Sequence, residues 1–123
     1  MVIKVCGIKS AANIKMINQS DIDMVGLNFY PSSVRYVGVD HSLDFDILAN
    51  NIARVGVFVN ETLAEVLKLA ALYRLDFIQL HGDEDESYCR AIADHYKIIK
   101  VFRIKPSFDF STTRGYAFAT YYL

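Results

Sequence analysis

The stretch Lys4-Val5-Cys6-Gly7-Ile8 carries the local signal that decides the fold. The segment from Val2 to Cys6 is mostly apolar, as a short strand is, and it leads directly into a glycine turn. Ser10 then offers a good N-cap for a helix over residues 11–19. The pattern predicts a strand–turn–helix unit with Cys6 at the carboxyl end of the strand, where α/β proteins collect ligands and catalytic groups.

The thiol of Cys6 has two interpretations at this point. A thiol at the end of a strand can act as a base or as a nucleophile. It can equally be a small buried residue, because unpaired cysteine is among the most buried residue types. Position alone favours the structural interpretation, so the rest of the sequence has to decide.

The composition indicates one hydrophobic core and excludes several kinds of partner. The chain has 123 residues, 53% of them hydrophobic, and a net charge of −1, which suggests a single domain over residues 1–123. There is no basic stripe that would indicate nucleic acid, no apolar run of the ~18 residues that span a membrane, and no secretion signal. The two cysteines, Cys6 and Cys89, form neither a disulfide framework nor a metal-ligand spacing. We therefore expect a reduced, soluble, cytoplasmic protein.

The strand-then-helix unit recurs along the whole chain. Further strands are predicted at 24–29, 53–59, 77–80, 98–104 and 116–123, and helices at about 43–52, after Asn60 as N-cap, and after Asp83 or Asp85. Residues 107–115 are polar and predict at most one short turn. This alternation indicates parallel strands joined by right-handed crossovers.

Two α/β architectures fit that alternation. An open doubly wound sheet suits a chain of 123 residues, whereas a (β/α)8 barrel needs eight strands and at least ~200 residues. The end of the chain favours the barrel, because Tyr121-Tyr122-Leu123 has the pattern of an interrupted strand with no helix to cover it.

Polar side chains gather at the predicted carboxyl ends of the strands. They are Cys6, Asn28, Asn60, His81 and Arg103 or Lys105, with Arg35 in the loop after the second strand. Such convergence is typical of a ligand site, but His81 could simply bond a loop carbonyl and Arg35 could be a surface charge. The acidic run Asp83-Glu84-Asp85-Glu86 is interpreted as helix capping, not as a metal site. The sequence contains no glycine-rich phosphate loop and no Gly-x-Ser-x-Gly nucleophile elbow.

Several blocks of the sequence form one pattern. They are Lys4-Val5-Cys6-Gly7-Ile8, Gly26-Leu27-Asn28-Phe29-Tyr30 leading to Ser33-Val34-Arg35-Tyr36-Val37, Val55-Gly56-Val57-Phe58-Val59-Asn60, Gln79-Leu80-His81-Gly82-Asp83-Glu84, and Ile99-Lys100-Val101-Phe102-Arg103. In their order and spacing, these blocks resemble one enzyme family, phosphoribosylanthranilate isomerase. The similarity covers the whole chain.

The resemblance implies a (β/α)8 barrel enzyme of tryptophan biosynthesis, of which this chain would form about six strands. The family converts N-(5′-phosphoribosyl)anthranilate, a phosphorylated small molecule, to 1-(2-carboxyphenylamino)-1-deoxyribulose 5-phosphate by an Amadori rearrangement, without cofactor or metal. By resemblance, Cys6 is the general base that takes the sugar C2 proton. Arg35 holds the anthranilate carboxylate, a task that suits a bidentate guanidinium, and His81 lines the substrate cleft.

The resemblance also implies that parts of the enzyme lie outside these residues. The family's general acid is an aspartate just after the sixth strand, and the loops of the seventh and eighth strands bind the substrate phosphate. We therefore expect the 123-residue chain to be inactive by itself. With its first and sixth strands unpaired at the edges and the apolar face of the sheet uncovered, we also expect it to self-associate.

Two other functions are weighed against the isomerase. One is a non-catalytic open-sheet α/β binding module, which would carry a phosphate loop or an acidic cluster at the strand ends instead of Cys, Asn and His. The other is a hydrolase that uses Cys6 and His81, for which the sequence offers no third group and no oxyanion loop.

Overall fold

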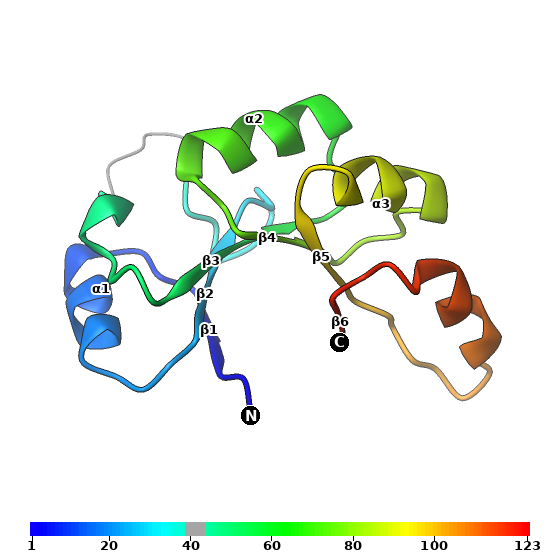
Figure 1. The fold of residues 1–123 in the computed structure, drawn as a ribbon, viewed down its shortest axis with the longest axis horizontal. Coiled ribbons are helices and arrows are strands. Elements are labelled where there is room, and N and C mark those ends of the chain that lie inside the picture. Colours follow the sequence, from blue (N-terminus) through cyan, green and yellow to red (C-terminus); the bar gives the residue numbers. More distant parts are fainter. Residues whose placement is uncertain (39–43) are drawn as a thin grey trace.

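The computed structural model describes residues 1–38 and 44–123. In this part of the chain, six strands alternate with helices (Figure 1). The strands are β1 Lys4–Cys6, β2 Met24–Asn28, β3 Ala53–Phe58, β4 Phe77–Leu80, β5 Lys97–Lys100 and β6 Tyr121–Tyr122; the α-helices are α1 Ala11–Asn18, α2 Leu63–Tyr73 and α3 Glu86–Ala93; the 3₁₀ helices are η1 Phe45–Ile47 and η2 Phe110–Tyr116.

The strands form one curled sheet in the order in which they occur along the chain, β1 to β6, and every neighbouring pair is parallel. The helices lie around the outer, convex side of this sheet, and the two termini lie at its open side (Figure 1). A doubly wound sheet would reverse its strand order part-way and carry helices on both faces. The sequential order and the one-sided helices therefore identify an incomplete (β/α)8 barrel and exclude the doubly wound sheet.

Two hydrophobic clusters bury the two faces of the sheet. The larger cluster lies between the sheet and the helices and includes Ile14, Leu27 and Ile78, which are fully buried. The smaller cluster lies on the concave face and consists of Met24, Val55, Phe77 and Ile99, none of them more than 7% exposed. The expectation of an uncovered apolar face is therefore wrong, because the curl of the sheet lets these side chains bury one another.

Each α-helix starts where a polar side chain caps its first turn. Ser10 caps α1 as predicted, and Asp85 rather than Asp83 caps α3. The predicted cap Asn60 is wrong, because Thr62 caps α2 and its hydroxyl accepts a hydrogen bond from the Glu65 amide. Asn60 instead has a left-handed backbone, with φ of 52°, which turns its side chain toward the next loop.

The predicted elements differ most from the structure near the C-terminal end of the described chain. The fifth strand ends at Lys100 instead of residue 104, and just beyond it the ring of Phe102 packs against Tyr116 of η2 at a centroid distance of 5.3 Å. The sixth strand is only Tyr121–Tyr122, since the residues before it belong to η2 and its following turn. The predicted helix at 43–52 is a single 3₁₀ turn, η1; Leu43 lies outside the described residues.

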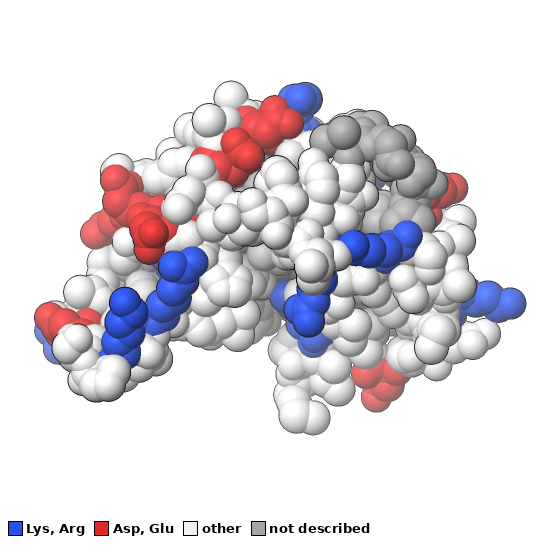
Figure 2. Space-filling view, turned by 180° about the vertical axis from the view of Figure 1, so that it is seen from behind, with Lys and Arg blue, Asp and Glu red and all other residues white. Residues whose placement is uncertain are grey.

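Figure 2 shows a largely uncharged face on which basic side chains are scattered and several acidic ones lie at the upper left. None of the helices in the described residues has the length and hydropathy that a membrane span requires.

Candidate active site

Cys6 lies at the carboxyl end of β1 and faces the concave side of the sheet. Lys4 and Cys6 share one face of β1 because they are two residues apart, and Lys4 is in register with Met24 of the concave cluster. The Lys4 ammonium donates a hydrogen bond to Cys6 Sγ over 2.9 Å. Gly26 lies opposite Cys6 on β2, and a side chain there would overlap with Sγ. A half-buried thiol with a cation beside it therefore stands at the inner rim of the sheet.

The loop after β2 places Arg35 close to Cys6. Asn28 ends β2, and its side-chain oxygen accepts a hydrogen bond from the Tyr30 amide over 2.9 Å, which bends the chain out of the strand. Further along the loop, the Arg35 side chain packs over Gly7: its Cδ lies 3.4 Å from the position that a Cβ on Gly7 would occupy. Gly7 also has φ of +91°, so glycine serves both the turn and this close packing. The structure thus brings Arg35 next to the residue that follows Cys6.

His81 occupies the same carboxyl-end rim but comes from β4, with β2 and β3 lying between it and β1. Its backbone amide donates to the Phe58 carbonyl over 2.9 Å, and its carbonyl accepts from the Arg103 guanidinium over 3.4 Å. The side chain is exposed. The structure therefore places Cys6 and Arg35 together and His81 farther along the rim.

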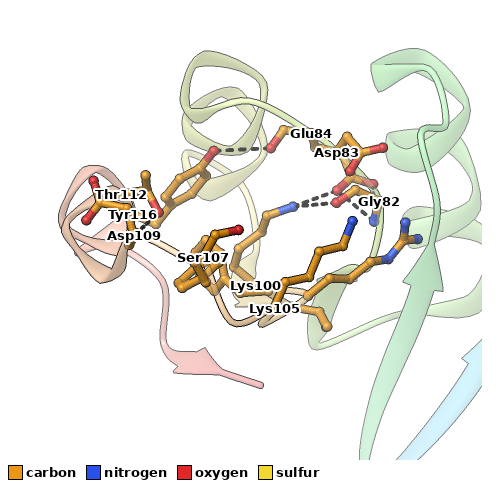
Figure 3. Close-up of a pocket in the computed structure, with 13 residues that line it drawn as sticks. Gly82, Asp83, Glu84, Lys100, Lys105, Ser107, Asp109, Thr112 and Tyr116 are labelled. Atoms are coloured by element: carbon orange, nitrogen blue, oxygen red, sulfur yellow. Dashed lines mark hydrogen bonds and ion pairs between the residues drawn. The ribbon is translucent and has the colours of Figure 1, made fainter.

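A buried ion pair behind His81 is the polar feature that the sequence interpretation missed. Lys100 Nζ lies 2.8 Å from Glu84 Oε2, and the two side chains are 4% and 2% exposed. Glu84 also accepts hydrogen bonds from the amides of Asn60 and Gly82. Lys100 donates a further hydrogen bond to the Gly82 carbonyl (Figure 3). The Asn60 side chain completes the network by accepting from the Asp83 amide over 2.8 Å. One carboxylate thus ties the loops after β3 and β4 to β5.

A cavity of about 550 Å³ opens beside this ion pair, at the carboxyl ends of β4 and β5. Figure 3 shows the Lys100 ammonium pointing at Glu84 and Gly82, with Tyr116 on the η2 side. The Tyr116 hydroxyl donates to the Glu84 carbonyl over 3.3 Å. The cavity is lined by Gly82, Asp83, Glu84, Lys100, Val101, Phe102, Arg103, Lys105, Ser107, Phe108, Asp109, Thr112 and Tyr116.

The sequence did contain a signal for the ion pair. Lys100 interrupts the apolar run from Ile98 to Phe102, and a lysine inside a buried strand needs a charged partner. The partner comes from the acidic run, for which the sequence predicts helix capping alone. That interpretation holds for Asp85 and is wrong for Glu84.

Burial changes the acidity of two groups beneath this rim. It raises the pKa of the Cys89 thiol to about 11, with Lys100 opposing the shift and Glu84 adding to it. It also raises the pKa of Tyr88 to about 12, helped by the charges of Glu84 and Glu61. Cys89 therefore stays a neutral thiol at neutral pH and behaves as a core residue.

No group of three or more His, Cys, Asp or Glu side chains that could hold a metal ion is found in residues 1–38 and 44–123.

The raised pKa of Cys89 predicts a loss of stability at alkaline pH. Because the folded pKa of about 11 lies above the ordinary value of 9.0, its contribution is complete below about pH 9 and is lost as the pH rises toward 11. Urea unfolding at pH 8.5 and 10.5 should show a decrease in unfolding free energy on the order of 1 kcal/mol. Cys89→Ala should reduce that decrease; an unchanged pH dependence in this variant would contradict the assignment.

Comparison with known proteins decides the family. The family model described as "N-(5'phosphoribosyl)anthranilate (PRA) isomerase" matches residues 3–121. The chain belongs to this isomerase family. The isomerase of Phocaeicola vulgatus is 39% identical to it over 117 residues, which are 94% of this chain and 55% of that protein. The isomerase of Parabacteroides distasonis is 36% identical over 121 residues, which are 94% of this chain and 54% of that protein.

Solved isomerase structures share the fold. The structure of the Thermotoga maritima isomerase superposes with a TM-score of 0.84 at 32% identity, covering 98% of this chain and 60% of that chain. A second isomerase structure, solved in complex with reduced 1-(o-carboxyphenylamino)-1-deoxyribulose 5-phosphate, superposes with a TM-score of 0.73 at 34% identity and covers 85% of this chain and 55% of that chain. The chain thus spans little more than half the length of the isomerases it matches.

Proposed function

We propose that residues 1–123 form the N-terminal part of one barrel domain that isomerises N-(5′-phosphoribosyl)anthranilate to 1-(2-carboxyphenylamino)-1-deoxyribulose 5-phosphate, a step of tryptophan biosynthesis. The observation that carries the proposal is the Cys6 sulfur at the inner rim of the curled sheet, with Lys4 bonded to it and Arg35 packed over the adjoining Gly7. The reduced phosphorylated compound bound to a family member supports a substrate of this class.

The reaction requires one acid and one base. The acid protonates the ribose ring oxygen, the C1–O bond breaks, and the nitrogen lone pair forms an iminium bond to C1. The base then takes the C2 proton, the C2–H electrons form a C1–C2 double bond, and the iminium electrons return to nitrogen. Loss of the proton on the C2 oxygen and addition of a proton at C1 give the ketose, so no oxidant or reductant is consumed.

Three residues of this chain take roles in that scheme. Cys6 is the base, because its sulfur faces the concave side where a sugar bound over the strand ends would lie. Arg35 binds the anthranilate carboxylate, which a guanidinium can grip with two parallel hydrogen bonds. His81, exposed at the end of β4, lines the far side of the substrate cleft. In the family, the acid is an aspartate that follows the sixth strand.

The proposal is tested with a joined polypeptide, in which residues 1–123 are followed by the part of the Thermotoga maritima isomerase beyond its matched region. We expect it to consume N-(5′-phosphoribosyl)anthranilate, measured as loss of the fluorescence of this substrate. A joined polypeptide that folds, as judged by circular dichroism, but neither turns over the substrate nor binds the reduced product analogue would contradict the proposal and favour a non-catalytic binding module.

A polypeptide of residues 1–123 alone should behave differently from the joined one. We expect turnover to be lost almost entirely, because the acid and the phosphate-binding loops of the family are not among these residues. The fluorescence assay, run at equal concentrations of the two polypeptides, measures the difference. Comparable turnover by both would show that residues 1–123 carry the whole catalytic site.

We further propose that residues 1–123 alone self-associate, and that the protein works in the cytoplasm. The outer edges of β1 and β6 have no neighbouring strand in the described part of the sheet, and Val2, Val5 and Leu123 are exposed beside them. Light scattering should give a mass above the 14.0 kDa of one chain; a monomer at all concentrations would argue against association.

The proposed location in the cytoplasm is supported by the two free thiols, which are typical of a protein in a reducing compartment.

A further inference from the structure

We propose that Lys4 is a positioning residue for Cys6: its ammonium group donates a hydrogen bond to the sulfur and holds it at the inner rim of the sheet. The inference rests on the proposed function, since it assigns a further residue to the same site. Lys4 contacts the sulfur directly, and its role requires no contact with the substrate.

The geometry of β1 brings the two groups together. Side chains two residues apart on a strand share a face, so the stem of Lys4 runs along the strand toward Cys6. The ammonium donates to Sγ over 2.9 Å. Both residues are half-buried, so water screens the contact less than it would screen a pair on the open surface.

The neighbouring strand is shaped for this pair. Gly26 is the β2 residue in register with Cys6, and a Cβ there would overlap with Sγ and lie 3.3 Å from Lys4 Nζ. The absence of a side chain at Gly26 therefore leaves the space in which sulfur and ammonium meet. Gly26 has no positive φ to explain it, so the close approach accounts for the glycine.

The chemical consequence follows from how thiols react. The thiolate is the reactive form, and a lysine next to the sulfur favours it over the thiol. A hydrogen bond between two charged groups is also stronger than a neutral one. Lys4 thus places a cation of the protein itself beside the sulfur of the proposed base, whatever charges the substrate brings.

The test measures the alkylation rate of Cys6 by iodoacetamide at pH 7.5 in residues 1–123, followed by peptide mass spectrometry. We expect Lys4→Met to slow alkylation of Cys6 roughly three- to tenfold, because the loss of the charge-assisted bond is partly offset by the higher nucleophilicity of the freed thiolate. Lys4→Arg, which keeps the charge, should recover most of the rate. Lys15→Met removes an exposed lysine of α1 and should leave the rate unchanged.

The fully buried Cys89 is an internal control for folding in the same sample. If Lys4→Met also exposes Cys89 to alkylation, the comparison is made with Lys4→Gln, whose amide keeps a polar group at the position. A Cys6 rate within twofold of the wild type in the folded uncharged variant, or a Lys4→Arg rate as low as that of the uncharged variant, would overturn the proposal.

A second readout separates this proposal from the proposed function. In the joined polypeptide, Lys4→Met should lower kcat with little change in KM, because Lys4 acts on the base and not on the bound substrate. A wild-type joined polypeptide without turnover would remove the isomerase function, while the alkylation result for Lys4 and Cys6 would stand by itself.

Discussion

Replacing Cys6 by serine in the joined polypeptide should reduce kcat by about 10²- to 10⁴-fold, the range that one general base contributes. A serine hydroxyl is close in size to the thiol and fits the space beside Gly26, but it does not provide an anionic base at neutral pH. Binding of the reduced product analogue, measured by titration calorimetry, should survive, because Arg35 and the rest of the cleft are unchanged.

Cys89→Ser is the matched control for that experiment. Cys89 lies on the buried face of α3 in the main core, where its Sγ donates to the Glu84 carbonyl over 3.8 Å. This variant should lose some stability and keep its turnover. Full turnover in Cys6→Ser would show that Cys6 is not the general base. Loss of both turnover and analogue binding would show that Cys6 maintains the structure of the site. A stable acyl-enzyme in Cys6→Ser would instead indicate a hydrolase.

Replacing Lys100 by methionine should lower the unfolding free energy of residues 1–123 by about 3–5 kcal/mol. The substitution leaves the Glu84 carboxylate charged inside the protein, with its side chain 2% exposed. Backbone amides of Asn60 and Gly82 still bond to it, which places the loss at the lower end of that range. Since a domain has only about 5–15 kcal/mol in total, the variant should unfold at a clearly lower urea concentration than the wild type.

The exposed pair of Lys68 and Glu65 provides the control. Their atoms lie 3.1 Å apart, but the side chains are 67% and 38% exposed, so Lys68→Met should cost about 1 kcal/mol or less in the same urea titration. In a double-mutant cycle, Glu84→Gln combined with Lys100→Met should cost less than the sum of the single changes. Equal effects of Lys100→Met and Lys68→Met would show that the ion pair contributes little.

The parts of the fold that could be predicted are those set by local pattern. Strand β4 was predicted with its observed limits, 77–80, because a short apolar run between a turn and His81-Gly82 permits few alternatives. The position of Cys6 at a strand end followed from the apolar run and the glycine after it. The alternation of strands and helices left two architectures open; the family resemblance implied the barrel, and the strand order of the folded sheet confirms it.

The parts that could not be predicted depend on contacts between distant residues. Glu84 and Lys100 are 16 residues apart and meet only because β4 and β5 pair. The packing of Arg35 over Gly7 depends on β1 and β2 being neighbours. The predicted sixth strand is too long, because Tyr116 and Phe118 are not strand residues. Tyr116 packs on Phe102, and the ring centroid of Phe118 lies 4.6 Å from the Arg90 guanidinium.

The most direct measurement is a crystal structure of the joined polypeptide with the reduced product analogue bound. We expect Sγ of Cys6 within hydrogen-bonding reach of the analogue's C2 substituents, the Arg35 guanidinium on its carboxylate, and Lys4 still bonded to the sulfur. An analogue bound away from the carboxyl ends of β1 and β2, with no contact to Cys6 or Arg35, would contradict the assignment of this site.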